Sequence, residues 1–165
     1  MILDLKHLFV NEGSVLPVDY QMDMSDVDFS GDFPLKHPIV INGSISNRAS
    51  VVEIELNISY VFSANCHRCG VFSEHTHNLG FKKILAVSVE SEENDTIITV
   101  PDMKLDLDEL VFSEVYMSLP TKHLCKEDCK GICTKCGKDL NSGKCGCNHK
   151  EIDPRLQKLA DLLKN

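Results

Sequence analysis

Eight cysteines constrain this chain more than any other feature, because six of them fall within 25 residues. The stretch HLCKEDCKGICTKCGKDLNSGKCGC runs from His123 to Cys147, and the other two thiols, Cys66 and Cys69, lie far upstream. The start of the chain lacks the basic and apolar regions of a secretory signal, so we expect a cytoplasmic protein in a reducing compartment. Clustered thiols in such a compartment are typical of metal sites rather than of disulfides.

The tail contains one complete set of ligands for a tetrahedral zinc ion. A C-x2-C pair suits zinc because its tight turn points both sulfurs at one ion about 2.3 Å away. Gly137 follows the pair of the tail, where a knuckle turn needs a conformationally permissive residue. The complete set has the spacing C-x2-C-x8-C-x-C and comprises Cys133, Cys136, Cys145 and Cys147.

Four thiols remain once that set is complete. Cys66 and Cys69 form a second C-x2-C pair, followed by Gly70, and Cys125 and Cys129 form a C-x3-C pair. We expect these two pairs to close a second zinc site that joins the tail to the body and contributes folding energy. In a competing partition Cys129 belongs to the tail site and another thiol is left free. Three neighbouring histidines are alternative ligands, although such residues are more often simply exposed: His67, His123 and His149.

Charge divides the chain near the start of the cysteine cluster. Residues 1–120 contain 7 Lys/Arg and 19 Asp/Glu, whereas residues 121–150 contain 7 Lys and 3 acids. The acidic body argues against non-specific binding of nucleic acid, which depends on neutralising phosphates. The basic tail allows a focused contact. However, a zinc ion with four thiolates carries a net charge of about −2, which offsets much of that positive charge.

The apolar pattern predicts an α+β protein built on an antiparallel sheet. In SVVEIELNISYVFSANC, strict alternation places Val52, Ile54 and the next even-numbered apolar residues on one face, as in a half-buried strand. Isoleucines at odd positions predict another strand over residues 39–45, with a turn or bulge at Asn42 and Gly43. We expect this sheet to be open or curled towards a barrel. Further strands are predicted within residues 76–90 and 95–100.

Two helices complete the predicted organisation. One lies near residues 105–119 and ends before Pro120, because the residue before a proline disfavours the α region. The other has Asp153 as a plausible N-cap. The predicted order is therefore a β-rich body over residues 1–120, a cysteine-rich zinc-binding tail over 121–150, and a C-terminal helix over 151–165.

Enzymatic interpretations find weaker signals. Cys66 and Cys69 have the spacing of a thiol-disulfide oxidoreductase, but the sequence after them favours a strand rather than the helix that such a motif opens. His75 and His77 alternate on one face of a strand and are either metal ligands or polar residues of a hairpin. No phosphate-binding loop, dinucleotide fingerprint or nucleophile elbow occurs, and no apolar run is long enough for a membrane span. We therefore expect neither a small-molecule substrate nor a membrane partner.

Several stretches resemble the YceD family, which is named for the accumulation of large-subunit ribosomal RNA. The resemblance runs from about Met22 to Leu163 and includes MSDVDFSG, the segment that ends in ANCHRCG, the cysteine cluster and IDPRLQKLADLL. The tail is similar to the cysteine-rich branch of the family. Other members keep the first C-x2-C pair but have lost most tail cysteines, which indicates that the two groups are partly separable units.

The resemblance implies a non-enzymatic role in supporting 23S ribosomal RNA and the assembly of the large subunit. Two mechanisms are open. In one, the protein contacts RNA directly, since zinc knuckles can present RNA-binding residues. In the other, the acidic body binds a basic ribosomal protein, as simple electrostatics favours. The candidate contact residues are Arg68, Lys122, Lys126, Lys130, Lys135 and Lys138.

Overall fold

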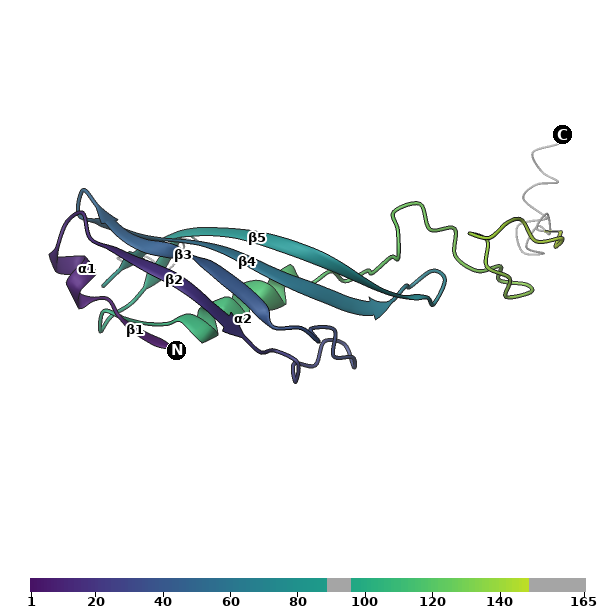
Figure 1. Cartoon of the computed structure of the whole chain (residues 1–165), viewed down its shortest axis with the longest axis horizontal. Helices are drawn as coiled ribbons and strands as arrows, with labels where there is room; N and C mark the ends of the chain where they lie inside the picture. The colour runs from purple at the N-terminus through teal and green to yellow at the C-terminus, as the bar shows by residue number, and fades with distance from the viewer. Residues whose placement is uncertain (89–95, 149–165) are drawn as a thin grey trace, which may run out of the picture.

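A computed structural model describes residues 1–88 and 96–148 as a long five-stranded sheet with one helix along it (Figure 1). The strand order is β2-β3-β4-β5-β6, and β1 and β7 form a separate two-stranded sheet. The elements are β1 (Ile2–Asp4), α1 (Lys6–Val10), β2 (Val15–Met22), β3 (Ile39–Arg48), β4 (Val51–Asn65), β5 (Phe72–Ala86), β6 (Ile97–Thr99), β7 (Lys104–Asp106) and α2 (Leu107–Ser118).

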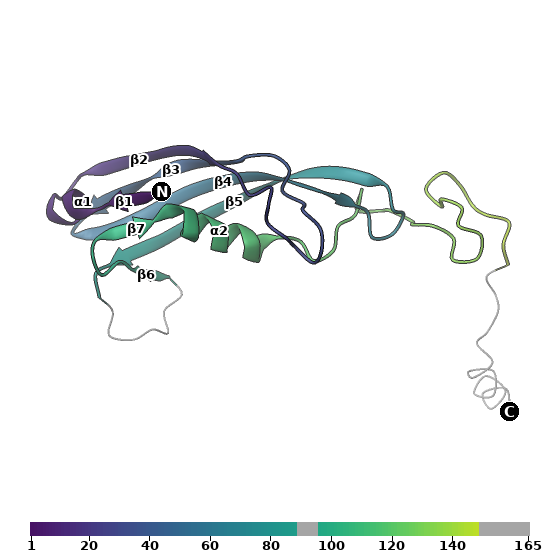
Figure 2. The same ribbon diagram turned by 90° about the horizontal axis from the view of Figure 1, so that it is seen from below.

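The alternation predicted for residues 50–66 is confirmed in β4. Ile54 and Ile58 are fully buried, whereas Glu55 and Asn57 between them are exposed. Figure 2 shows α2 along one face of the sheet, and among the described residues no helix covers the other face. The even-numbered side chains of β4 therefore pack towards α2, whose Val111 and Val115 are also buried.

Helix α2 begins where the sequence places its acidic residues. The side chain of Asp106 accepts hydrogen bonds from the backbone N–H groups of Asp108 and Glu109, which would otherwise lack partners in the first turn. The helix ends at Ser118, close before Pro120. This helix lies within the range predicted from the sequence.

The turn or bulge predicted at Asn42 and Gly43 is wrong. Strand β3 is continuous, and its pairing with β4 runs without a slip from Val40 to Arg48. Gly43 faces the core, where a Cβ atom would overlap the carbonyl oxygen of Glu55 and lie 2.8 Å from Cα of Leu56. Glycine is needed here because the backbone of β4 approaches closely, not because the chain turns.

The sheet differs from the prediction in one further way, and its strand order decides between an open sheet and a barrel. It is mixed rather than purely antiparallel, because the short β6 pairs with β5 in parallel at Ile84–Ala86. It also does not close into a barrel, since β2 and β6 stand at opposite ends of the strand order. The helix α2 covers the core face, so the sheet has no need to return on itself to bury that face.

The sequence analysis named neither α1 nor the eight-residue strand β2, because residues 1–32 mix apolar and acidic residues without a clear period. The predicted C-terminal helix over 151–165 lies outside the described residues. Within the described part of the chain, no helix is long and apolar enough to cross a membrane. After α2 the chain passes the end of β4 and β5 and continues as a tail beyond their turn (Figure 1).

Candidate metal centre

The first thiol pair sits in the tight turn between β4 and β5. The backbone N–H of Cys66 donates to the carbonyl of Val71, and the N–H of Gly70 donates to the carbonyl of Cys66. Gly70 has φ of +74°, a left-handed conformation that glycine adopts without strain. The Arg68 N–H lies 3.5 Å from Sγ of Cys66. The turn therefore holds both sulfurs at the end of the rigid β4–β5 hairpin.

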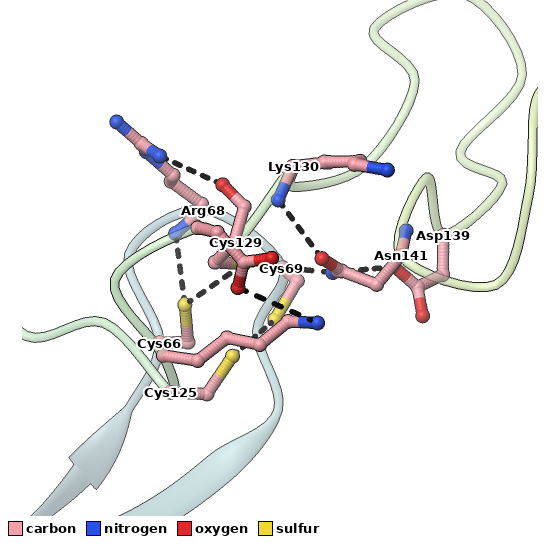
Figure 3. A network of polar contacts seen from close by, with 10 residues as sticks. Cys66, Arg68, Cys69, Cys125, Cys129, Lys130, Asp139 and Asn141 are labelled. Carbon is pink, nitrogen blue, oxygen red and sulfur yellow. Dashed lines mark hydrogen bonds and ion pairs between the residues drawn. The ribbon is translucent and has the colours of Figure 1, made fainter.

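The second pair comes from the segment after α2 and faces the first (Figure 3). Sγ of Cys66 lies 3.7 Å from Sγ of Cys129, and Sγ of Cys69 lies 3.6 Å from Sγ of Cys125. All four sulfurs lie within 4.8 Å of one another. Thiolates placed about 2.3 Å from one tetrahedral ion are about 3.8 Å apart, so the spacing fits a metal ion and is far too long for disulfides.

The remaining four cysteines form a second tetrad inside the tail. Their sulfurs also lie within 4.8 Å of one another, and none of the eight cysteines forms a disulfide. The turn repeats the first one: the Gly137 N–H donates to the carbonyl of Cys133, the Lys135 N–H approaches Sγ of Cys133, and Gly137 has φ of +71°. This tetrad consists of Cys133, Cys136, Cys145 and Cys147. The geometry is that of the two-site partition, not of the alternative with Cys129 in the tail site.

Arg68 fastens the tail to the hairpin turn. Its Nη1 donates to the carbonyl oxygen of Cys129 at 2.7 Å, and its own carbonyl accepts from the N–H of Ile132 at 3.2 Å. Gly131 fits between them with φ of +74°, and a Cβ there would lie 2.9 Å from the carbonyl oxygen of Arg68. The two tetrads are thus joined through backbone contacts as well as through the chain.

Asn141 makes a second connection, which the sequence analysis missed. It lies in the loop of the second tetrad, yet its Nδ2 is 3.5 Å from Sγ of Cys129 in the first. Its Oδ1 accepts from the N–H of Lys130, and its Nδ2 also contacts Asp139 (Figure 3). No spacing rule identifies this residue, because it acts on a thiol of the other site.

Hydrogen bonding divides the thiols of the first tetrad by acidity. Burial raises the pKa of Cys66, but hydrogen bonds from the N–H groups of Cys125, Arg68 and Cys69 outweigh it and lower this pKa to about 5. Burial and the neighbouring thiols raise the pKa of Cys125 to about 12. Four crowded thiols therefore cannot all ionise alone, whereas a bound cation favours ionisation of every one of them.

The second tetrad shows the same division. Hydrogen bonds from the N–H groups of Cys136 and Lys135 lower the pKa of Cys133 to about 6. Contact with Cys136, followed by burial, raises the pKa of Cys147 to about 12. Each tetrad thus contains at least one thiol that is ionised at neutral pH and one that keeps its proton until a cation binds.

The two described histidines that were proposed as alternative ligands, His67 and His123, belong to neither tetrad. His123 is buried, and its Nε2 makes a 2.8 Å hydrogen bond with Ser73. Nδ1 of His67 accepts from the N–H of His123. His75 and His77 do share one face of β5, but it is the core face: His77 stacks on Tyr60, and Nε2 of His75 is buried without a partner in the described structure. The third candidate, His149, lies outside the described residues.

The basic residues proposed to contact RNA do not share one environment. Arg68 is bonded to the tail backbone, and Lys122 and Lys126 line a cavity beside β5. Nζ of Lys135 donates to the carbonyl of Asn148, and Nζ of Lys138 donates to that of Lys144. The sixth, Lys130, is exposed between the tetrads. Their contact with RNA stays a prediction.

A sheet that carries at one end two four-thiol clusters, each placed to hold a metal ion, defines the class of protein, and one family model matches most of the chain. The profile described as Large ribosomal RNA subunit accumulation protein YceD matches residues 54–163, more than half of the chain. The chain belongs to the YceD family. The match includes all eight cysteines, and no solved structure gives a significant match.

Several curated proteins are similar over part of the chain. An uncharacterised protein of Mycobacterium tuberculosis is 38% identical over 74 residues, which are 45% of this chain and 35% of that protein. An uncharacterised protein of Mycobacterium leprae is 31% identical over 105 residues, which are 61% of this chain and 48% of that protein. A third relative is the Arabidopsis thaliana protein named Large ribosomal RNA subunit accumulation protein YCED homolog 1, chloroplastic. It is 22% identical over 161 residues, and the match covers 79% of this chain and 50% of that protein. The chain spans half or less of the length of these relatives.

Proposed function

We propose that this protein is a non-enzymatic ribosome-biogenesis factor that supports the accumulation of large-subunit ribosomal RNA. The observation that carries the proposal is membership of the YceD family over residues 54–163. The name of the chloroplastic relative refers to the same RNA. On this proposal the protein acts in the cytoplasm, on 23S RNA or on a ribosomal protein, and has no substrate to convert.

We propose zinc as the metal in both tetrads. Four thiolates in a tetrahedral arrangement suit zinc, and a site closed by four protein ligands is structural rather than catalytic. The turn geometry supports this role over thiol-disulfide exchange, because Cys66 and Cys69 lie between two strands and face two more thiols. The protein would then have two zinc ions, one that holds the tail on the hairpin and one that lies within the tail.

Elemental analysis tests the metal. About two zinc ions per chain are expected, with Cys66 unreactive to alkylation until a chelator removes the metal. One metal ion or none per chain would contradict the proposal of two sites. A reactive Cys66 in the fully loaded protein would instead revive the oxidoreductase interpretation.

The distribution of charge supports a protein partner over direct contact with RNA. The uncovered face of the sheet carries the carboxylates of Asp19, Glu55 and Glu74, and residues 1–120 are strongly acidic overall. Basic ribosomal proteins are electrostatically complementary to such a surface, whereas RNA is repelled by it. The tail remains the region where RNA contact is favourable.

Affinity capture with and without ribonuclease separates the two mechanisms. Capture of precursor large-subunit RNA that is lost with ribonuclease supports direct contact. Capture of a ribosomal protein that survives ribonuclease supports the adaptor mechanism. A variant with Cys133→Ser and Cys136→Ser controls for the tail. If neither large-subunit RNA nor a ribosomal protein is enriched, the biogenesis role is wrong.

A further inference from the structure

The strand β5 exposes one edge over most of its length. It is paired with β4 from Phe72 to Leu85, but with β6 only from Ile84 to Ala86. In Figure 1, β5 forms the outer border of the sheet. Nine residues, from Glu74 to Lys82, therefore have a neighbouring strand on one side only among the residues that the structure describes.

The pattern of hydrogen bonds shows which backbone groups point outwards. Successive residues of a strand direct their N–H and C=O groups to opposite sides. The Ile84 N–H donates away from β4 to the carbonyl of Thr96, and the carbonyl of Ala86 accepts from Val100 on that same side. Because the β4–β5 pairing has no slip, residues of the same parity direct their backbone groups to the open edge. These residues are Glu74, Thr76, Asn78, Gly80 and Lys82.

This edge lacks two of the features that usually prevent strand addition, although Glu74 and Lys82 carry charge at its two ends. No bulge interrupts it, and it contains no proline. The opposite edge strand, β2, contains Pro17, which removes a backbone donor. No hydrogen bond from the described residues, 1–88 and 96–148, reaches the outward groups of Glu74 to Lys82.

A cavity lies beside this edge on the core side. It has a volume of about 250 Å³, and among the described strands β5 lines it, through His75 and His77. The other walls come from the segment 120–127, in which Pro120 and Leu124 are apolar, whereas Lys122, Lys126 and Glu127 are charged. Alternate side chains of a strand added to β5 would point to this side of the sheet, and one of them could enter the cavity.

We infer that β5 is a docking edge for an extended segment of a partner protein, which adds a strand beside residues 74–82 and places an apolar side chain in this cavity. In this binding mode the main-chain hydrogen bonds provide affinity, and the pocket for an alternate side chain provides specificity. Nucleic acid cannot supply the alternating N–H and C=O groups that the edge requires. The inference does not rest on the ribosomal role and would hold for any function of the chain.

The charge of the chain favours a different protein, rather than a second copy of this chain, as the partner that binds the β5 edge. Pairing two β5 edges would place two strongly acidic bodies side by side, since each has 19 acidic and 7 basic residues within 1–120. Like charges at an interface oppose association. The partner segment is therefore neutral or basic, with one apolar residue at a fixed position.

A peptide library on phage provides the probe. The zinc-loaded full chain selects from random 12-residue peptides, and fluorescence anisotropy measures the affinity of each enriched peptide after synthesis. Asn78→Pro removes an outward N–H from the middle of the edge and leaves the pairing with β4 intact. Asn78→Ser is the matched control, because it keeps that N–H. We expect enriched peptides to share an apolar position, and to bind Asn78→Pro about tenfold more weakly and Asn78→Ser nearly as well as the unmodified chain.

Hydrogen exchange on the unmodified chain gives an independent readout if Asn78→Pro fails to fold. A bound peptide should slow exchange at the amides of Thr76, Asn78 and Gly80, while the odd-numbered amides between them are already protected by β4. Failure to enrich any peptide, or equal binding to both variants, would overturn the inference. So would dimerisation of the chain that Asn78→Pro abolishes, because the edge would then belong to a second copy.

Discussion

Nη1 of Arg68 donates a 2.7 Å hydrogen bond to the carbonyl oxygen of Cys129, across 61 positions of sequence. Arg68 lies between the two cysteines of the β4–β5 turn, and Cys129 lies in the opposite pair of the same tetrad. One side chain thus links the two halves of the site independently of any metal. A role for Arg68 in holding the tail is compatible with the predicted contact with RNA, and the two can be tested separately.

Replacement of Arg68 by alanine should loosen the first tetrad. A charged hydrogen bond to a carbonyl is lost, and at this partly exposed position the expected loss of unfolding free energy is about 1 kcal/mol. Denaturant unfolding of the metal-loaded chain measures the change. Arg48→Ala is the control, since Arg48 is exposed at the end of β3. Equal effects of the two substitutions would argue against a role for Arg68 in holding the tail.

Asn141→Ala should weaken metal binding at the first tetrad even though Asn141 lies in the loop of the second. Its Nδ2 lies 3.5 Å from Sγ of Cys129, and loss of such an outer contact typically lowers metal affinity about 10-fold or more. Competition with a chromophoric chelator measures the affinity of each site. To isolate the first site, the same substitution is made in a chain with Cys145→Ser and Cys147→Ser. An unchanged metal affinity in that chain would show that Asn141 does not contribute to metal binding at the first tetrad.

Alanine substitutions at two glycines of the tail allow the cost of backbone strain to be distinguished from the cost of steric overlap. Gly131 and Gly137 have φ of +74° and +71°, but only at Gly131 would a Cβ meet another segment, 2.9 Å from the Arg68 carbonyl oxygen. Gly137→Ala should cost about 1 kcal/mol from strain, and Gly131→Ala clearly more. Protease cleavage of the metal-loaded tail reports both changes. A larger effect at Gly137 would show that the backbone at Arg68 can move away from the added Cβ at little energetic cost.

In the sheet, Gly43→Ala should be strongly destabilising, because its Cβ would overlap the backbone of β4. We expect a loss of about 2–3 kcal/mol, as for overpacked cores. Gly80→Ala is the matched control: Gly80 is also in a strand, but a Cβ there meets nothing within 4 Å. Thermal unfolding compares the two. Similar midpoints would show that β3 and β4 can separate without cost.

Metal binding at pH 7 should release fewer than four protons per tetrad. The pKa of Cys66 is lowered to about 5 and that of Cys133 to about 6, so both thiols are already ionised, whereas Cys125 and Cys147 are still protonated. Titration calorimetry in two buffers of different ionisation enthalpy counts the protons. A disordered four-cysteine peptide is the control and should release nearly four. A release of four by the folded chain would contradict the lowered pKa values.

The same pKa values give the direction of the acid response. An unfolded thiol titrates near pH 8.5, so a lowered pKa in the folded state contributes stability that is complete above that pH. This contribution is lost as the pH falls through about 6 for Cys133 and about 5 for Cys66. Denaturant unfolding of the metal-free chain at a series of pH values measures this loss of stability.

Sequence patterns were sufficient where a local rule decides the structure. Alternation predicted β4, and Pro120 predicted the end of α2, because burial and the effect of a proline depend on neighbouring residues. Cysteine arithmetic favoured the observed partition of the eight thiols, but only the geometry excludes the alternative with Cys129 in the tail site. The strand and the end of the helix need no knowledge of distant contacts.

Other features depend on contacts that no local pattern encodes. Gly43 resembles a turn residue in sequence, but the approach of β4 explains it. The parallel pairing of β6 depends on how the chain returns to the sheet, and the contact of Asn141 with Cys129 depends on how the second tetrad packs on the first. The open edge of β5 likewise becomes visible only when the strand order is known.

The tetrad at the hairpin turn has a consequence for the unfolded chain. Cys66 and Cys129 are 63 positions apart, and β5, β6, β7 and α2 all lie between them. An ion that stays bound to both residues closes this segment into a ring, and a cross-link of that span restricts the denatured ensemble by about 4 kcal/mol. The metal would therefore stabilise half of the body as well as the tail, and its removal would lower the cooperativity of the whole sheet.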